Sequence, residues 1–229
     1  MAKNGANGDL KNHVYRLLKD RLITCKYMPG TMINESQLAA EFKLSRTPIR
    51  EALCRLEQDG LVQIMPKKGI RVTDINVQDV LFVFQARVEV EPLTLKMSAP
   101  FLTRDDLENL LDIFSHDEPD LEKAFWQDME MHAYLADHCG NPFIIDMLRK
   151  VFVRSCRISI ASNQTLQKIG NARAEHKDIL EKLLAGQDDA AADLLRQHLE
   201  TCKNYSLNFF NSTQAKVISS DWSLHNFLL

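Results

Sequence analysis

The sequence predicts a mainly α-helical protein of two parts, in which three helices and a β-hairpin precede a bundle of about six helices. Three observations lead to this fold class. Apolar residues recur at helical spacing along most of the chain, two short β-like runs lie close together at 61–65 and 70–73, and no strand pattern follows residue 76. We expect three segments, which are residues 1–74, 75–211 and a C-terminal tail at 212–229.

The composition is that of a water-soluble globular protein. Of the 229 residues, 45% are hydrophobic and 26% are charged, and no apolar run approaches the roughly 18 residues that span a bilayer. The polar start at residues 1–8 lacks the apolar core of a signal peptide. Five cysteines without a Cys-x-x-Cys pair favour free thiols over a disulfide framework or a zinc ribbon. We therefore expect a cytoplasmic protein with no membrane partner.

Charge is divided unevenly between the two parts. Residues 1–74 carry 13 Lys and Arg against 8 Asp and Glu, whereas residues 75–229 carry 15 against 23. A basic first part joined to an acidic second part fits a protein in which only the first part approaches phosphates.

Two helices are predicted at the start of the first part. Apolar side chains recur at helical spacing over residues 10–22, and Pro29-Gly30 then breaks the chain. Asn34 followed by Gln37 has the spacing of a capping box, which predicts that a second helix opens there.

A third helix and a hairpin complete the first part. Ser45 is placed to cap the helix, and Asp59-Gly60 ends it. The β-like runs that follow flank the basic sequence Pro66-Lys67-Lys68-Gly69, which predicts a hairpin with a basic tip. Helix, helix-turn-helix and hairpin, in this order, make a winged helix-turn-helix.

The second part is predicted to contain only helices. Thr103 and Asp106 form a capping box at one helix start, Pro119 and Pro142 lie at two others, and Gly170 is placed at a turn. The expected helices are 76–99, 103–115, 119–138, 142–162, 171–185 and 188–211.

The third helix and the hairpin carry candidate DNA contacts. Arg46 and Arg50 share one face because four residues separate positions on adjacent turns, and Thr47 lies beside them. Arginine on such a helix can read guanine in the major groove with two hydrogen bonds. The lysines of the hairpin could contact the neighbouring backbone, with a glycine that permits close approach. The alternative is a set of ordinary solvated charges. The predicted DNA contacts are Arg46, Thr47, Arg50, Lys67, Lys68 and Gly69.

A second constellation lies in the helical part. Asp128 and His132 stack on one helix face, and His176 and His198 lie on the fifth and sixth helices. One carboxylate and three imidazoles from three helices can converge inside a bundle, and such ligands suit zinc, nickel or another first-row divalent ion. From the residues alone, four unconnected polar side chains are an equal alternative.

Motifs in both parts resemble one family of bacterial regulators. SRTPIREALCRL at 45–56 and GLVQIMPKKGIRV at 60–72 resemble the DNA-binding domain of the GntR family. DMEMH at 128–132, GNPF at 140–143 and EHKDIL at 175–180 are similar to the helical ligand-binding domain, called FCD, of the FadR subfamily. The resemblance implies a homodimer that binds double-stranded operator DNA, usually as a repressor, and that is associated with the nucleoid when bound. It also implies that Asp128, His132, His176 and His198 hold a divalent metal.

An arginine in the first helix of the second part is the main effector candidate. Arg87 lies in a mostly apolar stretch, where a guanidinium needs an anion. Its structural alternative is pairing with Glu91, four residues on, whereas the resemblance implies a role facing the effector. Arg154 and Arg157 are weaker candidates. We expect a small carboxylate effector that bridges the metal and Arg87.

Three other functions use the same features. The four ligands could serve a metal-dependent hydrolase, the metal could be purely structural, or the chain could be a helical scaffold that never binds DNA. No separate base accompanies the ligand motif, since Glu130 lies on a different helix face from Asp128. A regulator, and not an enzyme, is therefore the function that the sequence predicts.

Overall fold

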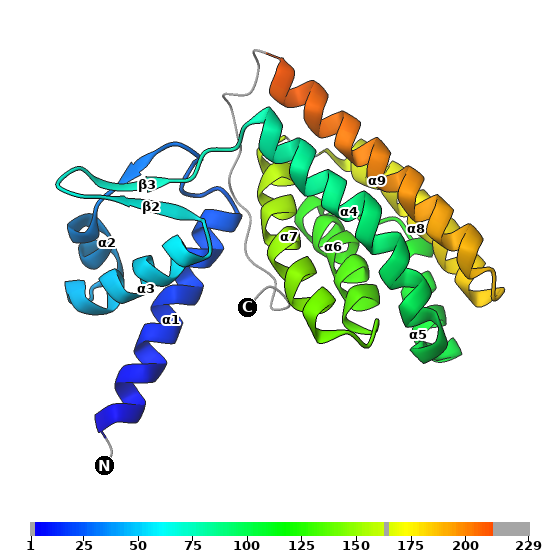
Figure 1. Cartoon of the computed structure of the whole chain (residues 1–229), viewed down its shortest axis with the longest axis horizontal. Helices are drawn as coiled ribbons and strands as arrows, with labels where there is room; N and C mark the ends of the chain where they lie inside the picture. The colour runs from blue at the N-terminus through cyan, green and yellow to red at the C-terminus, as the bar shows by residue number, and fades with distance from the viewer. Residues whose placement is uncertain (1–2, 163–164, 213–229) are drawn as a thin grey trace. The chain divides into compact units, whose positions relative to one another are not determined.

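The computed structural model describes residues 3–162 and 165–212, which form two compact units with their boundary between Ile75 and Asn76 (Figure 1). Apart from Ser212, the predicted C-terminal tail lies outside the described residues. Among the described helices, none combines the length and apolar character needed to cross a membrane. The predicted fold class is confirmed for both units: a small sheet accompanies helices in the first, and the second is all-helical.

Over residues 3–75, the N-terminal unit consists of three helices and a three-stranded sheet. The apolar stripe of α1 packs on that of α3, with Leu18 and Leu22 of α1 and Ile49 and Leu53 of α3 fully buried. The elements are α1 (Lys3–Ile23), β1 (Met32–Ile33), α2 (Glu35–Phe42), α3 (Arg46–Gln58), β2 (Val62–Met65) and β3 (Gly69–Val72).

The sheet holds one strand more than the predicted hairpin. Strand β3 lies in the middle, antiparallel to both β2 and β1, and Met32 of β1 pairs with Arg71 of β3. Gly30 makes this possible: its φ of +78° turns the chain, and its N–H donates to the carbonyl of Val72 at 3.0 Å. A strand of two residues is too short to produce an alternating pattern in the sequence.

Helix starts in this unit differ in detail from the expected caps. Asn34 caps α2, but its side chain accepts from the N–H of Ser36 at 2.7 Å instead of forming the predicted box with Gln37. Ser45 occupies the N-cap position of α3 without a side-chain capping hydrogen bond. Both helices nevertheless begin where the sequence places them, because packing of their apolar faces dominates the choice.

In the described part of the C-terminal unit there are six helices and one short 3₁₀ turn. Helix α4 packs along α9, and α8 packs against both α9 and α5 (Figure 1). The elements are α4 (Val77–Ser98), η1 (Ala99–Phe101), α5 (Arg104–Ser115), α6 (Leu121–Asp137), α7 (Pro142–Ala161), α8 (Leu166–Leu184) and α9 (Asp188–Asn211).

The start of α8 was predicted wrongly. The helix begins at Leu166, where Thr165 caps it by accepting from the N–H of Lys168 at 3.3 Å, so Gly170 lies inside the helix and not at a turn. Glycine in a helix interior costs only about 0.5–1 kcal/mol. The packing of α8 on its neighbours outweighs that cost.

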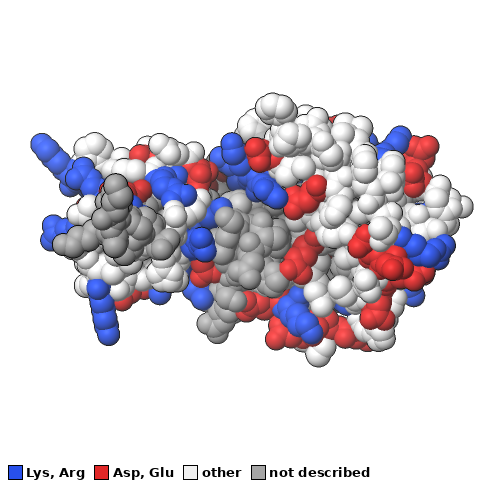
Figure 2. All heavy atoms as spheres, turned by 90° about the horizontal axis from the view of Figure 1, so that it is seen from below, with Lys and Arg blue, Asp and Glu red and all other residues white. Residues whose placement is uncertain are grey.

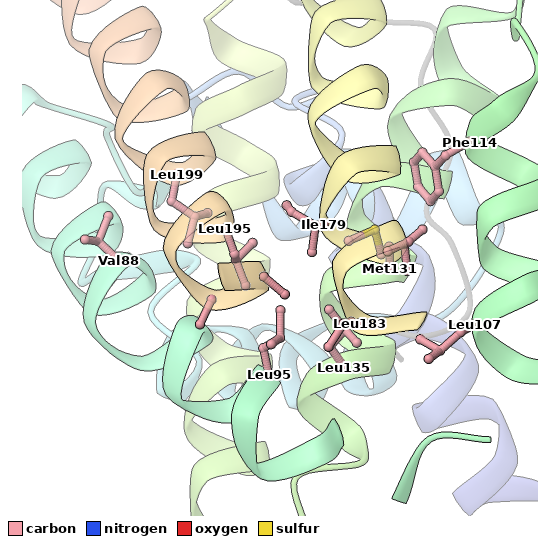
Figure 3. Packing of buried hydrophobic residues seen from close by; sticks show 13 residues of the cluster. Val88, Leu95, Leu107, Phe114, Met131, Leu135, Ile179, Leu183, Leu195 and Leu199 are labelled. Atoms are coloured by element: carbon pink, nitrogen blue, oxygen red, sulfur yellow. The ribbon is translucent and has the colours of Figure 1, made fainter. Parts of the chain in front are cut away.

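A continuous apolar core joins five helices of this unit (Figure 3). Leu95 of α4, Leu135 of α6, Leu183 of α8 and Leu195 of α9 are nearly or fully buried within it. Phe114 of α5 lies at one end, where its ring meets the His176 ring edge-on at 5.1 Å between centroids. The core therefore leads directly to the predicted metal-binding histidines.

Candidate metal centre and nucleic-acid interface

The four predicted metal ligands lie together. Helices α6, α8 and α9 bring one ligand atom each of Asp128, His132, His176 and His198 to within 4.8 Å of one another. The three histidines are at most 2% exposed, and the Asp128 side chain is 16% exposed. Asp128 and His132 meet because they are one helical turn apart on α6.

Ring nitrogens of the three histidines lie close to one another. Nε2 of His176 lies 3.3 Å from Nε2 of His132 and 3.2 Å from Nε2 of His198. Ligands about 2.1 Å from one ion, at tetrahedral or octahedral angles, lie about 3.0–3.4 Å apart. The spacing of these nitrogens therefore fits a shared first-row divalent ion.

Electrostatics within the cluster favour a ligand role as well. Burial, together with the neighbouring His198 and His132, holds the pKa of His176 well below its usual value, so this ring is neutral and offers a lone pair. Burial opposes the charged form of His198, but Cys202 and Glu175 outweigh it and raise its pKa. Binding of a metal ion would displace the proton that His198 holds.

Two carboxylates outside the cluster lie at the Nδ1 atoms of two of its rings. Oε2 of Glu91 lies 2.6 Å from Nδ1 of His132, and Oε2 of Glu175 lies 2.7 Å from Nδ1 of His198. A carboxylate on Nδ1 fixes the ring so that Nε2 points at the metal. The sequence indicated Glu91 only as a partner of Arg87 and gave no sign of a role for Glu175, because neither contact with a histidine is local in the chain.

Arg87 pairs with Glu91 and also lines a cavity. Its guanidinium, only 3% exposed, pairs with the Glu91 carboxylate and donates to Oγ of Ser155 at 2.8 Å. Burial raises the pKa of Glu91, but Arg87 and His132 outweigh this and lower it to about 2. Glu91 is therefore ionised and neutralises Arg87. This pairing is the structural alternative that the sequence left open for Arg87.

The cavity borders the cluster. It has a volume of about 50 Å³, room for a few water molecules, and Asp128 and His198 belong to both the cavity and the cluster. Lys168 and Tyr205 also line it. The two weaker arginine candidates are not among the lining residues: Arg154 is exposed on α7, and Arg157 is buried.

The predicted DNA contacts on α3 are exposed. Arg46, Thr47 and Arg50 face solvent on the side opposite the buried stripe. Among the described residues, no hydrogen-bonding or ion-pair partner is found for the guanidinium of Arg46 or Arg50. Arg55, by contrast, donates to Oδ1 of Asn12 at 2.8 Å and lies 4.0 Å from the centre of the Tyr15 ring. Arg55 therefore helps to hold the N-terminal unit together, whereas Arg46 and Arg50 are available to bind a partner.

The hairpin tip presents two exposed lysines. Lys67 and Lys68 lie in the turn between β2 and β3, and Lys67 has a φ of +63°. Gly69 has a φ of +112°, and a Cβ there would lie 3.1 Å from the carbonyl oxygen of Ile33, so the fold itself requires this glycine. On the face drawn in Figure 2, Lys and Arg side chains project from the N-terminal unit, and Asp and Glu are concentrated on the other unit.

Two known protein families match the chain, one in each of its two parts. Residues 10–72 match the bacterial regulatory proteins of the gntR family, and residues 82–201, more than half of the chain, match the FCD domain.

Individual relatives are similar over most of the length of both proteins. The HTH-type transcriptional repressor GlaR of Escherichia coli K12 is 24% identical over 82% of this chain and 91% of its own. The HTH-type transcriptional regulator YdhC of Bacillus subtilis 168 is 29% identical over 80% of this chain and 85% of its own.

Solved structures share the fold. McbR/YncC of E. coli matches with a TM-score of 0.76 at 19% identity, over 88% of this chain and 99% of its own. A GntR transcriptional regulator from Rhodococcus sp. RHA1 matches with a TM-score of 0.72 at 24% identity, over 86% of this chain and 97% of its own.

Proposed function

Because the chain belongs to the GntR family of bacterial regulatory proteins and carries an FCD domain, we propose that it binds operator DNA as a homodimer under the control of a metal-bound organic acid. The matched families and relatives are transcriptional regulators, so the chain is a transcriptional regulator and not an enzyme. Repression is the proposed outcome, since GlaR and RspR of E. coli K12 are named as repressors.

The observation that carries the DNA-binding proposal is the exposed face of α3. Arg46 and Arg50 extend from the first turns of a helix whose other face is buried, which is how a recognition helix presents base-reading side chains. Lys67 and Lys68 on the wing would add contacts to phosphates without sequence preference.

A homodimer would place two such helices on adjacent half-sites. Apolar side chains that a second copy could cover are present on two neighbouring helices of the C-terminal unit: Phe82 of α4 is 61% exposed, and Phe143 of α7 is 85% exposed.

The proposed effector site joins the metal cluster to the cavity. Asp128, His132, His176 and His198 would hold zinc or nickel, and the ion would supply positions for carboxylate oxygens. Arg87 would face the bound acid from the cavity wall. The small volume favours an acid of a few carbon atoms and disfavours a long acyl chain.

DNA binding is tested on duplexes selected from a random pool by the wild-type protein. Arg46→Ala/Arg50→Ala should bind them at least about 30-fold more weakly, since each bidentate contact contributes about 1–3 kcal/mol. The control Arg104→Ala/Arg149→Ala removes the same charge from the C-terminal unit and should bind normally. Equal affinity of the α3 variant and the wild type would overturn the proposal.

Effector binding is tested by calorimetry with a panel of small carboxylic acids on zinc-loaded protein. Arg87→Lys keeps a positive charge opposite Glu91 but loses the planar guanidinium, which can donate two parallel hydrogen bonds to a carboxylate. This variant should therefore bind the best acid about ten-fold more weakly at unchanged metal content. Arg154→Ala, at an exposed position, is the control. If chelation lowers thermal stability while no acid releases DNA, the metal is structural and the effector proposal fails.

A further inference from the structure

A buried arginine joins three helices beside the metal cluster. Arg173 of α8 is only 6% exposed, and its guanidinium donates to Oε1 of Gln127 on α6 at 2.7 Å. It also donates to two carbonyl oxygens at the end of α5, that of His116 at 2.7 Å and that of Ile113. The central carbon of the guanidinium lies 5.1 Å from the centre of the Phe114 ring. One side chain therefore holds α5 and α6 against α8.

Two of these contacts lead to predicted metal ligands. Gln127 directly precedes Asp128 on α6. The Phe114 ring meets the His176 ring edge-on, at 5.1 Å between centroids. Arg173 itself precedes His176 by three residues, which places both on one face of α8. Oδ1 of Asp128 lies 3.4 Å from Nδ1 of His176, so the arginine contacts the immediate neighbours of two ligands that different helices bring together.

The chemistry of the guanidinium suits this bridging contact. A buried arginine is usually paired with a carboxylate, but among the described residues Arg173 has only amide and backbone oxygens as acceptors. Two of them end α5, where the aligned peptide dipoles place negative partial charge. The planar, forked guanidinium can bond acceptors on two helices at once, which the compact ammonium of lysine does less well.

We propose that Arg173 is a positioning residue of the metal site. Its contact with Gln127 fixes the position of Asp128 on α6, and its contact with Phe114 supports the ring of His176. The inference rests on the metal site proposed above and adds a residue that does not touch the ion. Groups outside the ligand set commonly change metal affinity 10- to 100-fold, because they fix the geometry of the ligands.

Zinc and cobalt binding to the full-length protein test the inference. Arg173→Lys keeps the positive charge but loses the fork that reaches α5 and α6 together, so zinc affinity should fall about ten-fold. The visible bands of bound Co²⁺ report coordination geometry, and they should change in position or intensity. Arg196→Lys is the matched control. Arg196 joins α9 to α4 by donating to the carbonyl oxygen of Val88 at 2.9 Å, and this variant should bind both metals normally.

A milder variant removes only the contact with α6. Gln127→Ala should also weaken zinc binding, by less than Arg173→Lys does. If Arg173 acts through Gln127, the loss in the double variant should be smaller than the product of the two separate losses, since both substitutions break the same contact. Losses that multiply fully would show that the two residues act independently and would contradict the inference.

The outcomes separate a positioning role from a structural one, and both from failure of the metal site. If Arg173→Lys is less stable but binds zinc and cobalt as the wild type does, Arg173 only caps α5 and the inference is overturned. If Arg173→Lys does not fold, Gln127→Ala decides, and unchanged zinc affinity in that variant overturns the inference. If the wild type binds neither metal, the proposed metal site fails and the inference fails with it.

Discussion

Oε2 of Glu91 lies 2.6 Å from Nδ1 of His132, and the same carboxylate pairs with the Arg87 guanidinium. One buried carboxylate thus contacts both the residue proposed to face the effector and a residue proposed to hold the metal. If Arg87 shifted toward a bound acid, it would neutralise less of the Glu91 charge, and His132 would then face a more negative carboxylate. Linkage requires the converse as well, so metal and acid should each strengthen binding of the other to the same degree.

The Glu91 pairing predicts a pH dependence of stability. Burial opposes ionisation of Glu91, but Arg87 and His132 lower its pKa from 4.5 to about 2. A carboxyl group with a lowered pKa in the folded state stabilises the fold above its unfolded pKa and loses this contribution as the pH falls toward the folded value. Glu91→Gln should therefore be less stable than the wild type above pH 4.5, by roughly 3 kcal/mol.

Urea unfolding of both proteins in chelator, over a pH series, checks this prediction. The difference in free energy of unfolding should be constant near neutral pH and should shrink as the pH falls below 4.5. A difference that stays the same down to the acid limit of the fold would show that the carboxylate charge does not account for it.

The carboxylate behind His198 should matter for metal affinity without touching the metal. Glu175→Gln replaces an anion on Nδ1 of His198 with a neutral amide, and affinity for zinc should fall about 10- to 100-fold. Competition with a coloured chelator measures the change. Glu181→Gln, at an exposed position two turns further along α8, is the control. Equal zinc affinities of the two variants would remove Glu175 from the site.

The wing and the recognition helix should be distinguishable by their salt dependence. Lys67→Ala/Lys68→Ala removes two exposed cations, so the slope of log affinity against log salt should become shallower by about two if both contact phosphates. Affinity should fall by a similar factor for selected and unrelated duplexes. Fluorescence anisotropy at several salt concentrations gives both quantities, with Lys177→Ala on α8 as the control. A loss confined to the selected duplex would mean that the wing reads bases.

Sequence periodicity predicted the features that depend on local repetition, which are the helices and the faces of helices. Helical spacing of apolar residues located every major helix, and the four-residue spacing of Asp128 and His132 correctly placed them on one face. His176 and His198 lie more than 40 residues away from them in the chain, so the residues alone left a shared site and four unconnected side chains as equal alternatives, and the resemblance then favoured the shared site.

What the sequence did not predict depends on tertiary contacts or on very short segments. Strand β1 has two residues, too few for a pattern, and is formed by pairing with β3. Glu175 acquires its role only when α8 and α9 pack. Gly170 was misread because glycine more often ends a helix than lies inside one.

Two glycines with opposite environments give the last prediction. Gly30 has a φ of +78°, and a Cβ there would lie 2.2 Å from Oδ1 of Asp74, so Gly30→Ala should destabilise the N-terminal unit by about 1–3 kcal/mol. Gly170 lies inside α8 with nothing within 4 Å of its Cβ position. Gly170→Ala should therefore stabilise the C-terminal unit by about 0.5–1 kcal/mol. Amide hydrogen exchange, followed on peptides from each unit, separates the two effects. Faster exchange across residues 166–184 in Gly170→Ala would mean that a turn interrupts this helix, because only a turn with positive φ would make alanine unfavourable at that position.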